Sequence, residues 1–174
     1  SVAWQPRGDT LPVPAGWRSG SQRGDDLGER MGAAFDAAFR EGATAVVLIG
    51  SDSPTMPNER VTDAFERLGG VDCVLGPAED GGYYLVGLSS PAGAIFRGVE
   101  WSTDGVLRQT LEKARGAGIG VELLEPWYDV DTVEDLARLR AELGARSGVA
   151  AATRRALAEV DRDRDRVGRS PPRD

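Results

Sequence analysis

The sequence predicts an α/β domain with a mostly parallel β-sheet and flanking helices. Short, wholly apolar runs bounded by glycines alternate with longer segments in which apolar residues recur every three or four positions. Such short runs suit strands that are buried on both faces, as in a parallel sheet. Alternation of strands and helices indicates the α/β class. A length of 174 residues with 40% hydrophobic content is enough for one domain with a sizeable core.

The elements are expected in a regular order after an irregular start. Residues 1–23 are rich in Gly, Pro, Ser and Arg, so they are expected to form a loop with one short strand at 1–4. Thr132 and either Ser102 or Thr103 are expected to cap the helices that follow them. Strands are expected at 45–49, 72–76, 83–88, 121–124 and 128–130, and helices at 26–42, 57–70, 104–117, 132–143 and 151–160.

The end of the chain differs in composition from the rest. Residues 161–174 alternate Asp and Arg and then run into Ser-Pro-Pro. This segment has almost nothing apolar to bury, so we expect a disordered tail after a folded domain at 1–160.

Composition excludes several classes of function. A net charge of −7 and a pI of about 4.8 do not favour nucleic acid or an anionic membrane as a partner. The absence of histidine excludes Ser-His-Asp and Cys-His catalysis and imidazole-based zinc sites. The single cysteine, Cys73, lies in an apolar run, which favours a buried structural thiol over a reactive one. No run of about 18 apolar residues and no signal peptide is found, so a cytoplasmic location is expected.

Asp52 follows the apolar run 45–49, in the segment GSDSP (residues 50–54). Ligands of open α/β sheets bind at the carboxyl ends of the strands, where this carboxylate is expected to project. Oxygen ligands suit Mg²⁺ or Mn²⁺, so one interpretation is a metal ligand. A turn or helix-capping aspartate explains the residue equally well.

The segment GPAEDGGYY (residues 76–84) is more distinctive. Adjacent glycines at Gly81 and Gly82 permit positive φ and a close approach of a ligand to the backbone. Exposed N–H groups in such a turn could bind phosphate or sugar oxygens. Since Asp-Gly is also the commonest hairpin signal, a simple hairpin at Asp80-Gly81 is the favoured alternative.

Two further segments carry clustered polar residues near expected helix starts. Ser102, Thr103 and Asp104 either cap a helix or contact an acceptor or phosphate at its N-terminus. Asp129 and Asp131 are two residues apart, so in an extended segment both carboxylates point the same way and could reach one metal ion. Capping of the following helix explains Asp131 nearly as well. Arg23 and Arg30 are candidates for phosphate contacts, although exposed arginines are usually only solvated.

Five segments together resemble the recurring motifs of one family. They are residues 22–31 (QRGDDLGERM), 48–54 (LIGSDSP), 76–87 (GPAEDGGYYLVG), 101–103 (WST) and 129–132 (DVDT). In this order they resemble the family labelled DUF2064, a glycosyltransferase A-like (GT-A-like) family associated with radical-SAM gene clusters. The resemblance spans roughly residues 4–160, and its Asp-Gly-Gly-Tyr-Tyr block is the most specific part.

The resemblance implies a Rossmann-like nucleotide-diphospho-sugar transferase fold of the GT-A type. It implies that Asp52, Asp129 and Asp131 hold a Mg²⁺ or Mn²⁺ ion. It also implies a nucleotide-activated small molecule as substrate. Asp80 or Asp104 would orient or deprotonate an acceptor hydroxyl. The residues expected to bind substrate are Asp25, Arg30, Gly81, Gly82, Ser102 and Thr103.

The chain departs from the family at its start. Family members begin with a strand and a Gly-, Lys- and Arg-containing loop that resembles a phosphate-binding segment, and Ser1 already lies beyond that point. We therefore expect a GT-A-like fold that is N-terminally incomplete, and a chain that lacks part of the nucleotide site. An exposed sheet edge would favour a homodimer.

Three functions remain open. The first is metal-dependent glycosyl transfer from a nucleotide-diphospho-sugar to a small-molecule acceptor. The second is a guanylyltransferase-like nucleotidyl transfer onto a phospho-acid or cofactor. The third is a non-catalytic remnant that serves as a binding module, since fold kinship alone does not determine a reaction.

Overall fold

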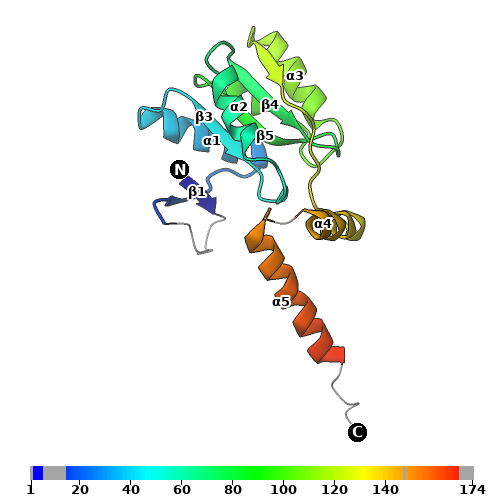
Figure 1. Cartoon of the computed structure of the whole chain (residues 1–174). Helices are drawn as coiled ribbons and strands as arrows, with labels where there is room; N and C mark the ends of the chain where they lie inside the picture. Colours follow the sequence, from blue (N-terminus) through cyan, green and yellow to red (C-terminus); the bar gives the residue numbers. More distant parts are fainter. Residues whose placement is uncertain (1, 6–14, 147, 169–174) are drawn as a thin grey trace. The chain divides into compact units, whose positions relative to one another are not determined.

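The computed structural model describes residues 2–5, 15–146 and 148–168. The chain divides into two compact units, which are described separately (Figure 1). Unit 1 comprises residues 1–50 and 57–128, and unit 2 comprises residues 51–56 and 129–174.

Unit 1 contains all the strands and most of the helices of the described chain. A two-stranded parallel sheet joins β1 (Val2–Gln5) to β2 (Arg18–Ser21). The remaining strands form a second sheet in the order β3-β5-β4-β6. The other elements are α1 (Leu27–Arg40), β3 (Val46–Ile49), α2 (Glu59–Arg67), β4 (Cys73–Pro77), β5 (Tyr83–Leu88), the 3₁₀ helix η1 (Gly93–Phe96), α3 (Val106–Gly116) and β6 (Val121–Leu123).

The larger sheet is mixed, so the expectation of a mostly parallel, Rossmann-like sheet is not confirmed. Strands β3, β4 and β6 share one direction, whereas β5 lies between β3 and β4 and runs antiparallel to both. Only the β4–β6 pair forms a parallel ladder within this sheet. An apolar run indicates that a strand is buried but not in which direction it runs, and the turn at residues 78–82 folds β5 back beside β4.

A register shift in the β4–β5 ladder lets both tyrosines of β5 be covered. Gly76 pairs with Leu85, and Pro77 then pairs with Tyr83, which skips Tyr84. Tyr83 packs against the main core cluster. Tyr84 is buried, and its hydroxyl donates a hydrogen bond to the Glu125 carbonyl at 3.0 Å. One extra residue in a strand redirects its side chains in this way.

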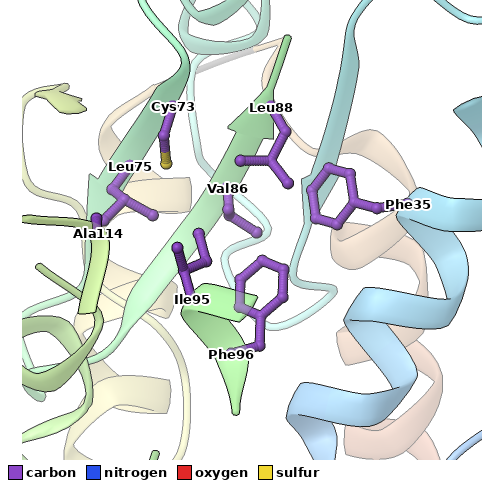
Figure 2. Packing of buried hydrophobic residues seen from close by; sticks show 8 residues of the cluster. All are labelled: Phe35, Cys73, Leu75, Val86, Leu88, Ile95, Phe96 and Ala114. Carbon is purple, nitrogen blue, oxygen red and sulfur yellow. The ribbon is translucent and has the colours of Figure 1, made fainter. Parts of the chain in front are cut away.

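The core lies where α1, η1 and α3 meet β4 and β5 (Figure 2). The rings of Phe35 and Phe96 stack at 5.7 Å and join α1 to η1. Other members are the alternating inward side chains of the two strands and one alanine of α3, as the period of two along a strand requires. The cluster consists of Phe35, Cys73, Leu75, Val86, Leu88, Ile95, Phe96 and Ala114.

Helix α2 packs on β3 and β4 through an apolar stripe that the sequence predicts. Ala64 and the helix-ending Leu68 are buried. A Cβ atom on Gly87 would lie 3.0 Å from Leu68 Cδ1 and 3.3 Å from Val47 Cγ2, so the absence of a side chain in β5 lets α2 lie close to the sheet.

Unit 2 contains α4 (Val133–Ala145) and α5 (Ala151–Gly168), together with the short segment 51–56. Leu139 and Leu143 of α4 are buried. Arg140 and Asp161 join the two helices by paired hydrogen bonds of 2.8 and 2.7 Å. The Thr55 hydroxyl donates to the Glu142 carboxylate at 2.9 Å, which attaches the short segment to α4.

Several predicted elements are confirmed and others need correction. The strand at the start, α1, and α4 with its Thr132 cap are found as predicted, and the N-cap of α1 is Asp26. The strand expected at 128–130 is absent, since this segment forms no ladder in the described chain. The strand at Arg18–Ser21 was not expected, because RSGS has no apolar alternation.

The C-terminal helix is longer than predicted. α5 extends to Gly168, past the expected end at 160, so residues 161–168 are helical rather than disordered. Alternating Asp and Arg can form ion pairs along a helix even without apolar residues. The remainder of the expected tail, residues 169–174, lies outside the described residues. No helix in the described chain has the length and hydropathy needed to span a membrane.

Candidate functional site

The turn between β4 and β5 combines two glycines with one carboxylate. Asp80 Oδ1 accepts a hydrogen bond from the Gly82 N–H at 2.8 Å. The Ala78 N–H donates to the Gly82 carbonyl at 3.1 Å, and this bond closes the hairpin. The favoured alternative for this segment, a hairpin, is therefore what the structure contains. The Gly82 N–H already bonds to Asp80, so it is not free for a ligand in this conformation.

Gly81 connects this turn to the beginning of α3. Its φ of +93° lies in the left-handed region, which glycine adopts without strain. A Cβ atom here would lie 2.2 Å from the Asp104 carbonyl oxygen, so only glycine permits this approach. The Gly81 carbonyl accepts the Leu107 N–H at 2.9 Å. The turn thereby satisfies a first-turn N–H of α3 that would otherwise lack a partner.

The start of α3 differs from the expected capping arrangement. The N-cap residue is Gly105, and no side chain caps the helix. Thr103 acts one step earlier, because its hydroxyl donates to the Glu100 carbonyl at 2.8 Å and accepts the Gly105 N–H at 3.4 Å. Ser102 has a φ of +62°, which is unusual for a residue with a side chain. The expectation that Ser102 or Thr103 is the N-cap is therefore wrong, because the helix begins at Val106 and its N-cap is Gly105.

Trp101 anchors this loop to two other elements of unit 1. A Cβ atom on Gly28 of α1 would lie 2.8 Å from Trp101 Cζ2 and 2.9 Å from Trp101 Nε1. On another side, the Trp101 ring meets the Tyr83 ring edge-on at 84°, with centroids 6.4 Å apart. The loop before α3 is thus held between α1 and β5.

Polar residues at the start of α1 bond mainly to the local backbone. Asp26 caps the helix, with Oδ1 accepting the Glu29 N–H at 2.8 Å. The Glu29 carboxylate accepts the Asp25 N–H at 2.8 Å. Arg30 Nε donates to the Gly24 carbonyl at 3.2 Å, and its Nη2 donates to the Asp25 carbonyl at 3.4 Å. This arrangement positions the Gly24-Asp25 backbone and leaves the Asp25 carboxylate on the surface.

A buried hydroxyl pair lies beneath this region. Burial raises the pKa of the Tyr83 hydroxyl, and within the described chain neither this hydroxyl nor that of Thr110 has a hydrogen-bond partner. The Thr110 side chain is fully buried within α3. With its pKa raised, Tyr83 remains a neutral phenol at physiological pH and serves as a packing residue beside Trp101.

The carboxylates expected to bind metal lie in unit 2. Oxygen atoms of Asp129 and Asp131 lie within 4.8 Å of one another. The Asp52 carbonyl accepts the Val130 N–H at 2.9 Å, so segment 51–56 runs beside segment 129–131. Within the described part of unit 2, the Asp52 carboxylate does not form a set with both other carboxylates at that spacing. Asp52 is therefore joined to the segment that carries Asp129 and Asp131 by its backbone carbonyl and not by its carboxylate.

The sequence of this chain matches a known protein family. A model of the family described as "Uncharacterized protein conserved in bacteria (DUF2064)" matches residues 2–103, which is more than half of the chain. The chain belongs to this family.

This DUF2064 protein is also similar to a solved structure. A crystal structure of a "putative nucleotide-diphospho-sugar transferase" from Desulfovibrio desulfuricans G20 is 37% identical to it, with a TM-score of 0.73. The similarity covers 87% of this chain and 74% of that one. Both chains thus share an α/β fold. No curated protein matches the chain.

The family match includes the turn and the loop 101–103, while Asp104, Asp129 and Asp131 lie beyond residue 103. In unit 1 of this DUF2064 protein, the structure brings the turn at Asp80–Gly82 against the loop at Ser102–Asp104. Sequence reasoning missed Gly28 and Trp101 as the residues that fasten this loop to α1. An isolated glycine within a helical pattern was the available signal, since such a glycine commonly marks close packing.

Proposed function

We propose that this protein is a metal-dependent transferase of the GT-A type that moves a glycosyl group from a nucleotide-diphospho-sugar to a small-molecule acceptor. The observation that carries the proposal is the similarity to the "putative nucleotide-diphospho-sugar transferase" of Desulfovibrio desulfuricans G20, which extends over 87% of the chain at 37% identity.

The proposed metal is Mg²⁺ or Mn²⁺, held by Asp129 and Asp131 with Asp52 as a third candidate. The donor set fits, because carboxylate oxygens within 4.8 Å of one another suit a small, hard divalent cation. Such an ion, when bound, would neutralise the diphosphate of the donor and the charge on its leaving oxygen. The backbone bond from Val130 to Asp52 supports the pair by fixing the segment that carries it.

The acceptor is assigned to unit 1. Asp80 and Asp104 both expose their carboxylates, and the Gly81 contact keeps the two backbones together. One of these carboxylates would accept the proton of an acceptor hydroxyl as the oxygen attacks the anomeric carbon. The other would orient the same acceptor. The nucleotide diphosphate leaves with the electrons of the broken glycosidic bond.

The second candidate is nucleotidyl transfer onto a phospho-acid or cofactor. It is favoured by the same metal ligands but differs in its leaving group. Glycosyl transfer releases a nucleoside diphosphate, whereas nucleotidyl transfer from a nucleoside triphosphate releases pyrophosphate. Product analysis with UDP- and GDP-sugars beside GTP therefore separates the two reactions.

Thermal unfolding with and without Mn²⁺, across nucleotides and nucleotide sugars, tests the proposal first. A ligand at 100 times its dissociation constant should add about 2.7 kcal/mol to the free energy of unfolding. We expect this shift to require Mn²⁺ and to be lost in Asp129→Asn and Asp131→Asn. Glu134→Gln is the matched control, since Glu134 is an exposed carboxylate on the neighbouring helix turn.

Two outcomes would contradict the proposal. An unchanged Mn²⁺-dependent shift in Asp129→Asn and Asp131→Asn would remove these residues from the metal site. No shift with any nucleotide or nucleotide sugar would favour the non-catalytic binding module. Paramagnetic broadening of the Gly82 amide signal by bound Mn²⁺ would further show whether the metal and the acceptor residues serve the same substrate.

A further inference from the structure

We infer that Trp101 is a positioning residue which, anchored on Gly28 of α1, holds Ser102 in its left-handed conformation and so presents the Ser102 hydroxyl to the substrate. This inference rests on the proposed transferase function and deepens it, because it names the residue that shapes the acceptor side of the site.

The first observation is the backbone of Ser102. In the described chain only Ser102 and Ala150 have a positive φ without being glycine, and Ser102 is two positions before Asp104, one of the proposed catalytic residues. A residue with a Cβ atom enters this region at a cost in free energy, and the cost persists only where the surroundings enforce it. Glycine at this position would avoid the cost, so the hydroxyl is the feature that serine adds.

The second observation is the way the neighbouring loop residues are used. The Thr103 hydroxyl is engaged with Glu100 and Gly105, at 2.8 and 3.4 Å. The Glu100 N–H donates to Gln109 Oε1 at 3.0 Å, which ties the loop to α3. Ser102 is exposed, and no hydrogen bond to its hydroxyl is found within the described chain. Of the two hydroxyls in this loop, Ser102 is thus the one available to a ligand.

The third observation is the contact that fixes the residue before Ser102. The Trp101 atoms nearest to Gly28 are Cζ2 and Nε1, which belong to the fused bicyclic ring. Phenylalanine cannot reach this position, and any residue larger than glycine at 28 would also collide with the Phe96 carbonyl, 2.5 Å from its Cβ atom. The buried Nε1 makes no hydrogen bond to the described chain, so the indole is placed by its shape.

These contacts leave the loop little freedom. Trp101 is held between α1 and β5, and Thr103 is bonded back to Glu100, so the residues on both sides of Ser102 are fixed and its conformation is restricted. The exposed Ser102 hydroxyl, two positions before Asp104 in the chain, can then donate to or accept from a hydroxyl of the acceptor. Preorganisation of this kind lowers the entropy cost of binding.

The conformational part is tested by NMR without any substrate. The one-bond Cα–Hα coupling and the carbon shifts of Ser102 report the sign of φ. We expect the left-handed signature in the wild type and its loss in Trp101→Leu, with partial loss in Trp101→Phe. Trp127→Phe is the matched control, because Trp127 Nε1 is also buried without a hydrogen bond. An unchanged Ser102 signature in a folded Trp101→Leu would overturn the positioning role.

The functional part uses Ser102→Gly, which keeps the conformation and removes the hydroxyl. We expect the acceptor KM to rise roughly tenfold, the loss of about one hydrogen bond, with little change in kcat. Trp101→Phe should shift KM in the same direction, and the double variant should add little to either change. Unchanged KM in Ser102→Gly would overturn the assignment of the hydroxyl.

Failure of the proposed function is distinguishable from failure of this inference. If the wild type transfers no glycosyl group, the KM measurements have no signal. The proposed function and the role of the Ser102 hydroxyl in substrate binding are then both overturned. The NMR arm then still decides whether Trp101 controls the conformation of Ser102.

Discussion

At Gly28, Gly76 and Gly81 of unit 1, a side chain would collide with another element or loop. A Cβ atom on Gly28 would meet Trp101 and Phe96, and one on Gly81 would meet Asp104. On Gly76 it would lie 2.4 Å from the ring of Tyr84. Two of these glycines fasten the loop before α3, so their role in the proposed site is to bring backbones together rather than to bind ligand.

Gly81→Ala should lower the free energy of unfolding by roughly 2–4 kcal/mol, which combines left-handed strain with overpacking. Gly42→Ala is the matched control, since Gly42 has the same φ of +93° but nothing within 4 Å of an added Cβ atom. It should cost only about 1 kcal/mol. Urea denaturation of both variants gives the comparison. Equal losses would mean that the contact with Asp104 contributes nothing.

Helix α4 shows how local hydrogen bonds define an element. Its N-terminus carries a capping box in which the Thr132 hydroxyl accepts the Asp135 N–H at 3.1 Å. The Asp135 carboxylate in turn accepts the Thr132 hydroxyl at 2.6 Å and the Thr132 N–H at 2.9 Å. These bonds involve residues three apart, so the sequence alone predicts where the helix begins.

The hydrogen bond from the Thr132 hydroxyl, assisted by backbone N–H groups, lowers the pKa of Asp135. A depressed folded-state pKa stabilises the fold above the unfolded value of about 3.9. That contribution is lost as pH falls from there through the folded-state pKa.

We therefore expect α4 to lose amide-exchange protection in acid below about pH 4. Asp135→Asn should show less protection at neutral pH and a weaker dependence on acid. Glu134→Gln, an exposed carboxylate in the same turn, is the control. The same acid dependence in Asp135→Asn as in the wild type would contradict the role of the carboxylate.

The core of unit 1 contains a thiol that can report the opening of this unit. The single cysteine, Cys73, is buried in the core of unit 1 and pairs across the ladder with Leu88. Burial raises the pKa of its thiol to about 12, and the neighbouring Asp72 carboxylate contributes to the rise. The burial of Cys73 confirms the prediction of a buried cysteine.

Labelling of Cys73 by a thiol reagent at pH 8 should proceed only when unit 1 opens. Leu88→Ala removes a fully buried side chain and should cost about 3 kcal/mol, so labelling should accelerate roughly a hundredfold. Val133→Ala, at a residue of unit 2 that is 78% exposed, should leave the rate nearly unchanged. Fast labelling of the wild type would show that the thiol is accessible in the folded state.

Much of the local structure was predictable from the sequence. Helix α1, β5, and the Asp-Gly hairpin follow from periodicity and from side-chain preferences within a few positions. The unexpected β2 and the longer α5 are cases in which polar sequences carry no periodic apolar signal. Family membership was also predictable, because it depends on motifs in order.

The sequence by itself determined the kind and order of most elements, the chemistry of the exposed carboxylates and the family. Tertiary structure alone decided that β5 lies antiparallel between β3 and β4, that the Gly81 carbonyl accepts the Leu107 N–H of α3, and that Trp101 lies against Gly28. It also decided that the Thr103 and Arg30 side chains donate hydrogen bonds to nearby backbone carbonyls. Capping and periodicity involve neighbours in the chain, whereas strand pairing and close backbone contacts join residues whose separation leaves no local signal.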